Sequence, residues 1–202
     1  MHLIDTGKLR DIVAYGNGQN DAVIFTDGWV PGPRLWVKDD TCPAGAAGRI
    51  GAVMFHKSLG KPLCFELEIP VEWKWAWEER GTQIVLVELL APLIALYTWK
   101  TFLRGRTCIF FNDSTTAESM LVKGYSNAAV DANAVMAEFW HLACDVEICA
   151  YIDRVPTDCN PSDGCSRGST FVDAFTHGWE QCRPLVNEAW VERGPGSAFR
   201  EG

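Results

Sequence analysis

The sequence has 202 residues, of which 48% are hydrophobic and 22% are charged, so it has room for one sizeable core. Its 18 basic and 26 acidic residues give a net charge of −8, which argues against a protein that holds nucleic acid by a basic surface alone. No uninterrupted apolar run reaches the roughly 18 residues that span a bilayer, and the N-terminus lacks the basic-then-apolar pattern of a signal peptide. We therefore expect an intracellular protein, in the cytoplasm or nucleus, with no membrane partner.

The eight cysteines do not form a recognisable metal or disulfide pattern. There is no Cys-x-x-Cys pair, and the spacings between Cys144 and Cys149 and between Cys159 and Cys165 suit zinc poorly. A chain of this length also builds a core without disulfides. We expect reduced thiols, with a structural zinc as the alternative.

The chain divides into three parts. Residues 1–20 are a polar N-terminal extension that ends in a loop rich in Gly and Asn. Residues 21–167 hold nearly all of the patterned sequence and form the expected domain. Residues 168–202 form a C-terminal tail, for which we expect a short helix and a frayed end.

Within the middle part, five short runs rich in apolar residues predict strands. They lie at residues 22–26, 49–55, 62–69, 107–111 and 147–152. Three longer patterns predict helices at residues 84–103, 115–124 and 128–143, the last capped by Ser126 or Asn127. A final short helix is expected to begin at Asn160-Pro161, with proline in its first position. This order predicts an α/β fold, a mixed sheet with helices packed on it.

The tryptophan-rich segment at residues 70–80 fits two structures. The leading proline favours a short helix, whereas the alternation of Trp73, Trp75 and Trp77 fits a strand equally well. Trp29 and Trp36, which follow the first strand, are candidates to stack on bases or sugars. Core packing is the default for most of these aromatic side chains.

Three aspartates occupy positions where ligand-binding groups are often found, but each has a simpler explanation. Asp27 ends the first strand, where an Asp-Gly turn is common. Asp113 ends the fourth strand, where it would cap the next helix. Asp163 lies at the start of a helix, where a negative charge complements the helix dipole.

Glu88 is harder to explain by local structure. It lies in an apolar run with no Lys, Arg or His within four residues on either side, and a helix that is apolar all round is normally buried. An isolated buried carboxylate costs several kcal/mol unless a cation or a donor meets it. Pro92 cannot donate to the Glu88 carbonyl, which places Glu88 near the start of its helix if the proline lies in the first turn. A shared metal ion is one partner for Glu88, and a remote Arg or Lys is the other.

The four carboxylates together suggest more than each one alone. Acids at the ends of neighbouring parallel strands, with one acid from each packed helix, can meet at one edge of a sheet. Hard oxygen ligands suit Mg²⁺ or Mn²⁺. Two such ions activate a water and stabilise a leaving oxygen in phosphodiester cleavage.

Four motifs in chain order resemble those of ribonuclease H domains, and the resemblance covers about residues 21–167. A fifth segment resembles the closing motif of such domains in retroelement reverse transcriptases. The four motifs are Phe25-Thr-Asp-Gly28, Gly48-Arg-Ile-Gly-Ala-Val-Met54, Val87-Glu-Leu-Leu-Ala91 with Leu93-Ile-Ala-Leu96, and Phe111-Asn-Asp-Ser-Thr115. The closing segment is Arg154-Val-Pro-Thr-Asp-Cys-Asn-Pro-Ser-Asp-Gly-Cys-Ser-Arg167.

The resemblance implies a ribonuclease H-like mixed five-stranded sheet of order 3-2-1-4-5 with helices on both faces. It also implies hydrolysis of the RNA strand of an RNA–DNA hybrid with two Mg²⁺ or Mn²⁺ ions, in a chain that partners a reverse transcriptase polymerase domain. Carried over by motif, the catalytic metal ligands are Asp27, Glu88, Asp113 and Asp163. Asn112 and Ser114, which flank one of these ligands, are the expected substrate-binding residues.

The sequence departs from the family pattern in ways that leave alternatives open. Many family members carry a histidine in the loop before the last carboxylate, whereas residues 153–162 contain none and Asp158 occupies the matching place. This and the acidic net charge favour a catalytically silent module that mediates protein or nucleic-acid contacts, whereas the presence of all four acids favours the enzyme. Integrase-like and exonuclease relatives fit less well, because the last acid is Asp and because residue 29 is Trp rather than Glu.

Overall fold

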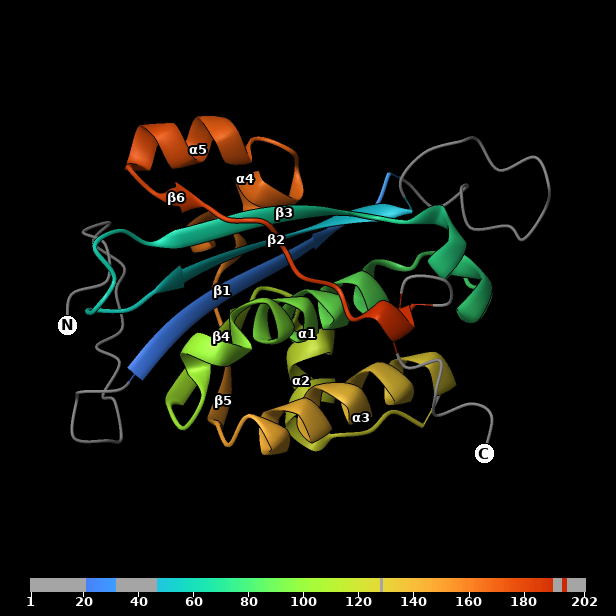
Figure 1. The fold of residues 1–202 in the computed structure, drawn as a ribbon. Coiled ribbons are helices and arrows are strands. Elements are labelled where there is room, and N and C mark those ends of the chain that lie inside the picture. The colour runs from blue at the N-terminus through green and yellow to red at the C-terminus, as the bar shows by residue number, and fades with distance from the viewer. Residues whose placement is uncertain (1–20, 32–46, 128, 191–193, 196–202) are drawn as a thin grey trace.

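A computed structural model of the protein describes residues 21–31, 47–127, 129–190 and 194–195 (Figure 1). Its centre is a six-stranded sheet of order β5-β4-β1-β2-β3-β6. The strands are β1 (Asp21–Trp29), β2 (Gly48–Phe55), β3 (Leu63–Ile69), β4 (Thr107–Asn112), β5 (Cys149–Arg154) and β6 (Glu180–Gln181). The first three are antiparallel neighbours, and β4 and β5 run parallel to β1. The predicted order of five strands is confirmed, and β6 adds a short sixth strand beside β3.

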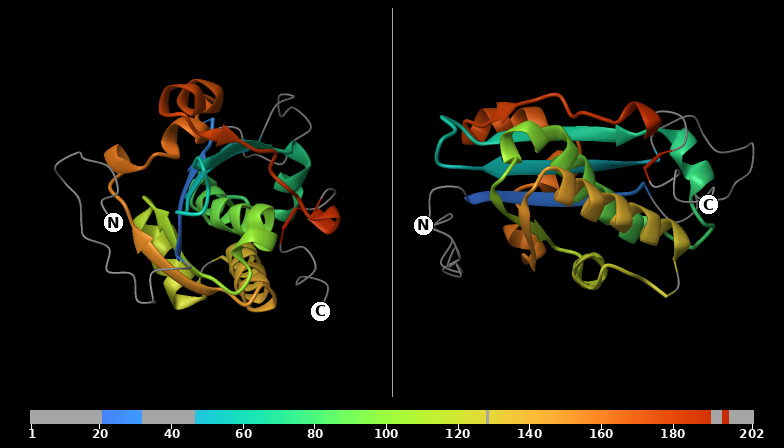
Figure 2. Two further views of the ribbon diagram at one scale, coloured as in Figure 1. Left: turned by 60° about the vertical axis from the view of Figure 1, so that its left-hand side comes forward. Right: turned by 60° about the horizontal axis from the view of Figure 1, so that its bottom comes forward.

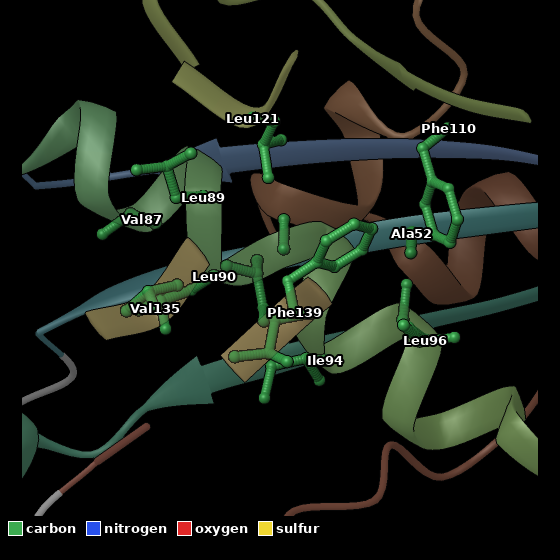
Figure 3. Packing of buried hydrophobic residues seen from close by; sticks show 14 of the residues in the cluster. Ala52, Val87, Leu89, Leu90, Ile94, Leu96, Phe110, Leu121, Val135 and Phe139 are labelled. Atoms are coloured by element: carbon green, nitrogen blue, oxygen red, sulfur yellow. The ribbon is translucent and has the colours of Figure 1, made fainter. Parts of the chain in front are cut away.

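Helix α1 (Ile84–Leu103) forms the centre of the larger core. It packs against the sheet on one side and α3 (Val130–Asp145) on the other, with α2 (Thr115–Lys123) on the same face of the sheet (Figures 1 and 2). Leu90 and Ile94 of α1 lie beside Val135 and Phe139 of α3 (Figure 3). Because both sides of α1 meet apolar surface, its sequence is apolar all round.

The same composition makes α1 long and apolar enough to cross a membrane, and it is the only such helix among the described residues. However, 67% of the most apolar 18-residue stretch of this helix is buried inside the fold. The burial on both sides by sheet and α3 accounts for the apolar sequence without a bilayer.

The opposite face of the sheet carries α4 (Asp163–Ser166) and α5 (Thr170–His177). Here Cys165 and Ala174 pack against Val53 and Cys64. The predicted arrangement of helices on both faces is therefore confirmed. Cys42 lies outside the described residues, and the other seven cysteines are free.

The part of the chain after residue 167 contains the expected short helix, α5, and further packed structure. Besides α5 and β6, a 3-10 helix η4 (Glu188–Trp190) brings Trp190 into the main core with 3% exposure. The compact part of the chain thus extends past residue 167, whereas the predicted extension at residues 1–20 lies outside the described residues.

Of the two structures that the tryptophan-rich segment fits, the structure has the short helix led by proline, a 3-10 helix η2 (Val71–Ala76) with Trp73 buried in the core. Two other predicted local structures differ from those observed. Helix α3 begins at Val130, so that its N-cap residue is Ala129 rather than Ser126 or Asn127, and Ala129 has no side chain to cap it. The Asn133 side chain joins α3 to the preceding turn, because it bonds both the N–H and the carbonyl of Ser126. The last short helix begins at Asp163 rather than at Asn160-Pro161.

Candidate functional site

Asp27 lies near the end of the central strand β1, opposite Gly51 of β2. Strand alternation points its side chain to the face that carries α4, and only 4% of the residue is exposed. Helix α4 packs very close to the sheet here: a Cβ on Gly51 would lie 2.4 Å from the Ser166 nitrogen. The absent side chain at position 51 therefore lets α4 approach the Asp27 carboxylate.

Glu88 lies in the second turn of α1 with 4% exposure. The close approach of α1 to β1 depends on Gly28, where a Cβ would lie 2.9 Å from the Glu88 nitrogen. Pro92 lies in the interior of α1 rather than in its first turn, so the Glu88 carbonyl lacks its usual helical donor. The Asn112 amide replaces that donor at 3.3 Å and also donates to Glu88 Oε2 at 3.0 Å. One side chain thus fixes both the backbone and the carboxylate of Glu88.

Asp113 directly follows β4, the parallel neighbour of β1. Asp27, Glu88 and Asp113 each offer a carboxylate oxygen, and these atoms all lie within 4.8 Å of one another. The arrangement needs β1, β4 and α1, so residues 86 positions apart in the sequence meet at one end of the sheet. We call these three residues the carboxylate cluster.

Asp163, the fourth predicted ligand, is nearby but is not part of this cluster. Its two oxygens accept from Arg167 Nε at 2.9 and 2.8 Å, an ion pair within one helical turn. Its charge still acts on Asp27 and raises the pKa of that carboxyl. The structure therefore brings three of the four predicted carboxylates together and places the fourth at their edge.

Two buried polar side chains fix α4 and the loop before it. Ser166 is fully buried and its hydroxyl donates to Asp27 Oδ2. Asn160 donates to the Thr26 carbonyl at 3.1 Å and accepts from the Ser162 hydroxyl at 2.6 Å. The bonds to Asp27 and Thr26 join this segment to β1, and the bond between Ser162 and Asn160 stabilises the turn into α4. The position of Asp163 at the start of α4 is therefore fixed relative to β1.

Burial and mutual repulsion raise the pKa values of the clustered acids. Desolvation is the main cause for Asp27, whose pKa rises to about 7 with Asp113 and Asp163 adding to the effect, although the Ser166 hydroxyl and Arg167 oppose it. Burial raises the pKa of Glu88 well above its usual range, again with help from Asp27 and Asp113. Carboxyls with raised pKa values at neighbouring positions gather at functional sites more often than elsewhere.

The donor set suits a hard divalent cation. All three clustered groups offer carboxylate oxygens, which are the ligands that Mg²⁺ and Mn²⁺ prefer. A bound cation would also offset the burial of these charges and the repulsion between them, which together raise these pKa values. The residues present therefore fit the metal ions that the family resemblance implies.

The two expected substrate-binding residues have structural contacts here. Asn112 is 2% exposed and its amide is engaged by Glu88, while its oxygen accepts from the Ser114 backbone at 2.7 Å. The Ser114 hydroxyl caps α2 by accepting from the Ala117 backbone at 3.3 Å. Contact of either with a substrate stays a prediction.

Sequence reasoning missed the residues that hold the acids in place, namely Arg167, Ser166 and Asn160. A signal for Arg167 was present, because its spacing of four from Asp163 places both on one face of a helix. The contacts of Ser166 and Asn160 join residues 139 and 134 positions apart in the sequence, and no local sequence pattern indicates such contacts.

Trp29 and Trp36 are the candidates to stack on bases or sugars. Trp36 lies outside the described residues, whereas Trp29 ends β1 with the Arg49 guanidinium 5.8 Å from its ring centroid.

No protein-family model matches the sequence, and no curated protein matches it. Solved structures do match, at low identity. The RNase H1 of the halophilic archaeon Halobacterium salinarum is 13% identical with a TM-score of 0.51, over 75% of this chain and 98% of the other. The chain has the ribonuclease H fold.

Two further structures support the same fold. The N-terminal RNase H domain of a Mycobacterium tuberculosis protein, solved as a fusion with maltose-binding protein, is 12% identical with a TM-score of 0.51, over 78% of this chain and 98% of that one. LC11-RNase H1, isolated from compost by a metagenomic approach, is 14% identical with a TM-score of 0.52, over 74% and 95% of the two chains. At these identities the likeness concerns the ribonuclease H fold, and the carboxylate cluster is this chain's own evidence for chemistry.

Proposed function

We propose that this protein is a divalent-metal-dependent endonuclease of ribonuclease H type that hydrolyses the RNA strand of RNA–DNA hybrids. The observation that carries the proposal is the carboxylate cluster, whose oxygens lie within 4.8 Å of one another at the strand ends of a ribonuclease H fold. Buried acids with raised pKa values are costly to keep, and a cation that they share offsets that cost.

Each residue of the site has a defined part in this proposal. Asp27, Glu88 and Asp113 would hold Mg²⁺ or Mn²⁺, and Asp163 at their edge would complete the set for a second ion. Such ions, when bound, supply an activated water and stabilise the leaving oxygen of the phosphodiester. Asn112 keeps the Glu88 carboxylate in place, and Ser166 fixes one oxygen of Asp27 so that the other is free to face a ligand.

We further propose that the chain belongs to a retroelement reverse transcriptase, with residues 21–167 as the catalytic domain beside a polymerase domain, and works inside the cell. The support is the segment 154–167, which resembles the closing motif of the ribonuclease H domains in such enzymes. A net charge of −8 fits a domain that relies on a partner to hold the nucleic acid.

The test is cleavage of an RNA–DNA hybrid with a labelled RNA strand, in Mn²⁺ and in Mg²⁺. We expect RNA fragments with 3′-hydroxyl and 5′-phosphate ends, and no cleavage of double-stranded DNA. The Asp113→Asn variant should be inactive, whereas the variant of an exposed acid on α3, Asp145→Asn, should retain activity.

The second candidate is a catalytically silent module of the same fold. The observation that favours it is Asp158, which lies in a 3-10 helix, η3 (Thr157–Cys159), before α4, where many family members carry a histidine. This candidate predicts that the folded wild-type protein cleaves no hybrid with either ion. Cleavage that is lost in Asp113→Asn would exclude it.

A further inference from the structure

Arg167 connects the fourth acid to the rest of the site. Its Nε donates to both oxygens of Asp163, at 2.9 and 2.8 Å. The Asp163 oxygens lie outside the carboxylate cluster, although Asp163 and Arg167 both act on the charge of Asp27. The positively charged guanidinium of Arg167 therefore lies at the edge of the site. It binds Asp163, the predicted metal ligand that the carboxylate cluster does not include.

Arg167 is placed so that it can exchange Asp163 for another anion. The side chains of Arg167 and Asp163 are 56% and 32% exposed, and they form a pair four residues apart on a short helix. Such exposed pairs contribute little to stability, because water and salt screen them. Arg167 therefore loses little when another anion of suitable shape takes the place of Asp163.

A phosphate of a nucleic acid has that shape and charge. The planar guanidinium donates in pairs to phosphate as well as to carboxylate. A strand that brings its scissile phosphate to the carboxylate cluster also brings phosphates past Arg167, because Arg167 directly follows Ser166, whose hydroxyl donates to Asp27.

We propose that Arg167 is a positioning residue that holds Asp163 away from the carboxylate cluster until a phosphate of the bound strand takes the guanidinium. Asp163 then turns to the cluster and completes the set of oxygen ligands. Tight binding at the second metal position thereby depends on substrate, and the free protein holds its metal with three carboxylates. This inference rests on the proposed function, because it takes the clustered acids to be metal ligands.

The test measures Mn²⁺ binding to the protein alone by isothermal titration calorimetry. Four proteins form a cycle: wild type, Arg167→Gln, Asp163→Asn and the double variant. Removal of the positive charge of Arg167 strengthens Mn²⁺ binding whether residue 163 is Asp or Asn. The informative quantity is therefore the difference between the effect of Arg167→Gln in wild type and its effect in Asp163→Asn. We expect Arg167→Gln to strengthen binding about two- to fivefold more when Asp163 is present than when it is Asn, as release from one exposed ion pair implies.

A matched control is Arg104→Gln. Arg104 is similarly exposed, at 58%, and pairs with Glu147 at 3.6 Å, but it follows the C-terminal end of α1. That end is about 24 Å along the helix from Glu88 at 1.5 Å per residue. This variant should leave Mn²⁺ binding unchanged.

Hydrolysis of a hybrid gives a second readout that a merely structural role would not move. Arg167→Gln should raise KM several-fold with a smaller change in kcat, because it loses the phosphate contact but frees Asp163. Arg167→Lys keeps the positive charge, so its KM should lie between that of wild type and that of Arg167→Gln.

The outcomes separate the two proposals. If Asp27→Asn leaves Mn²⁺ binding as in wild type, the metal site and the proposed function are wrong. If Asp27→Asn abolishes binding but Arg167→Gln has the same effect with and without Asp163, the metal site stands and the role of Arg167 is wrong. A KM unchanged in Arg167→Gln would likewise overturn the phosphate exchange.

Discussion

Asp27→Asn should make the metal-free protein more stable while it abolishes cleavage. Burial raises the pKa of the Asp27 carboxyl to about 7 in the folded chain, from an ordinary value of 3.8. The folded state therefore binds more protons than the unfolded state between these pH values, and stability falls as pH rises from about 4 to about 7. The Asn side chain has no charge to desolvate and its oxygen still accepts from Ser166.

The size of this effect follows from the shift. At about 1.4 kcal/mol per pKa unit, a carboxyl that moves from 3.8 to about 7 costs the folded state at most about 4 kcal/mol at pH 8. At pH 5 most of that cost is absent, because the folded carboxyl is protonated. The advantage of Asp27→Asn over wild type should thus grow by about 3 kcal/mol between pH 5 and pH 8.

Urea unfolding without metal, at pH 5 and at pH 8, measures this difference, with Asp145→Asn as the control for the loss of an exposed carboxylate. Adding Mn²⁺ at pH 8 should remove much of the variant's advantage, since ligand at about 100 times its Kd stabilises the wild type by about 2.7 kcal/mol and the variant lacks a ligand. An advantage that is absent, or that does not change with pH, would refute the account of a desolvated, repelled carboxylate.

Three further outcomes are expected. Gly51→Ala should cost about 2 kcal/mol or more, because the new Cβ meets α4 backbone at 2.4 Å, whereas Gly60→Ala, with open space, should change the urea midpoint little. Binding of a hybrid by the isolated chain should be weak and depend little on salt, as fluorescence anisotropy between low and moderate salt would show, since the net charge is −8. Asp158→His should raise kcat in Mg²⁺, because histidine can pass a proton or meet a phosphate near neutral pH; an unchanged or lower kcat contradicts that role.

The architecture could be predicted because its signals are local and repeated along the chain. The apolar runs that form β1 to β5 and the unbroken apolar pattern of α1 each announce an element without knowledge of its neighbours. Chain order and family resemblance then supply the sheet. By contrast β6 has two residues, and a strand that short has no pattern of its own.

The site was predictable where a residue conflicted with its surroundings. Glu88 in an apolar helix demands a partner wherever the fold places it. Asp27 and Asp113 gave weaker signals, because turns and caps use the same residues. Ser166 gave almost none, since its contact with Asp27 is defined only when α4 packs against Gly51.

Pro92 and Asn112 show how one such conflict is resolved, and the resolution is testable. Proline removes the donor of the Glu88 carbonyl, and the Asn112 amide replaces it at 3.3 Å. Restoring the donor with Pro92→Ala should make the bond from Asn112 to that carbonyl redundant. In a double-mutant cycle, Asn112→Ala should therefore cost about 1 kcal/mol less in the Pro92→Ala background than in wild type, the usual worth of one hydrogen bond. The remaining bond, to Glu88 Oε2, should keep its full cost in both backgrounds. Equal costs for Asn112→Ala, measured by urea unfolding, would mean that the amide serves the carboxylate alone and that water satisfies the carbonyl.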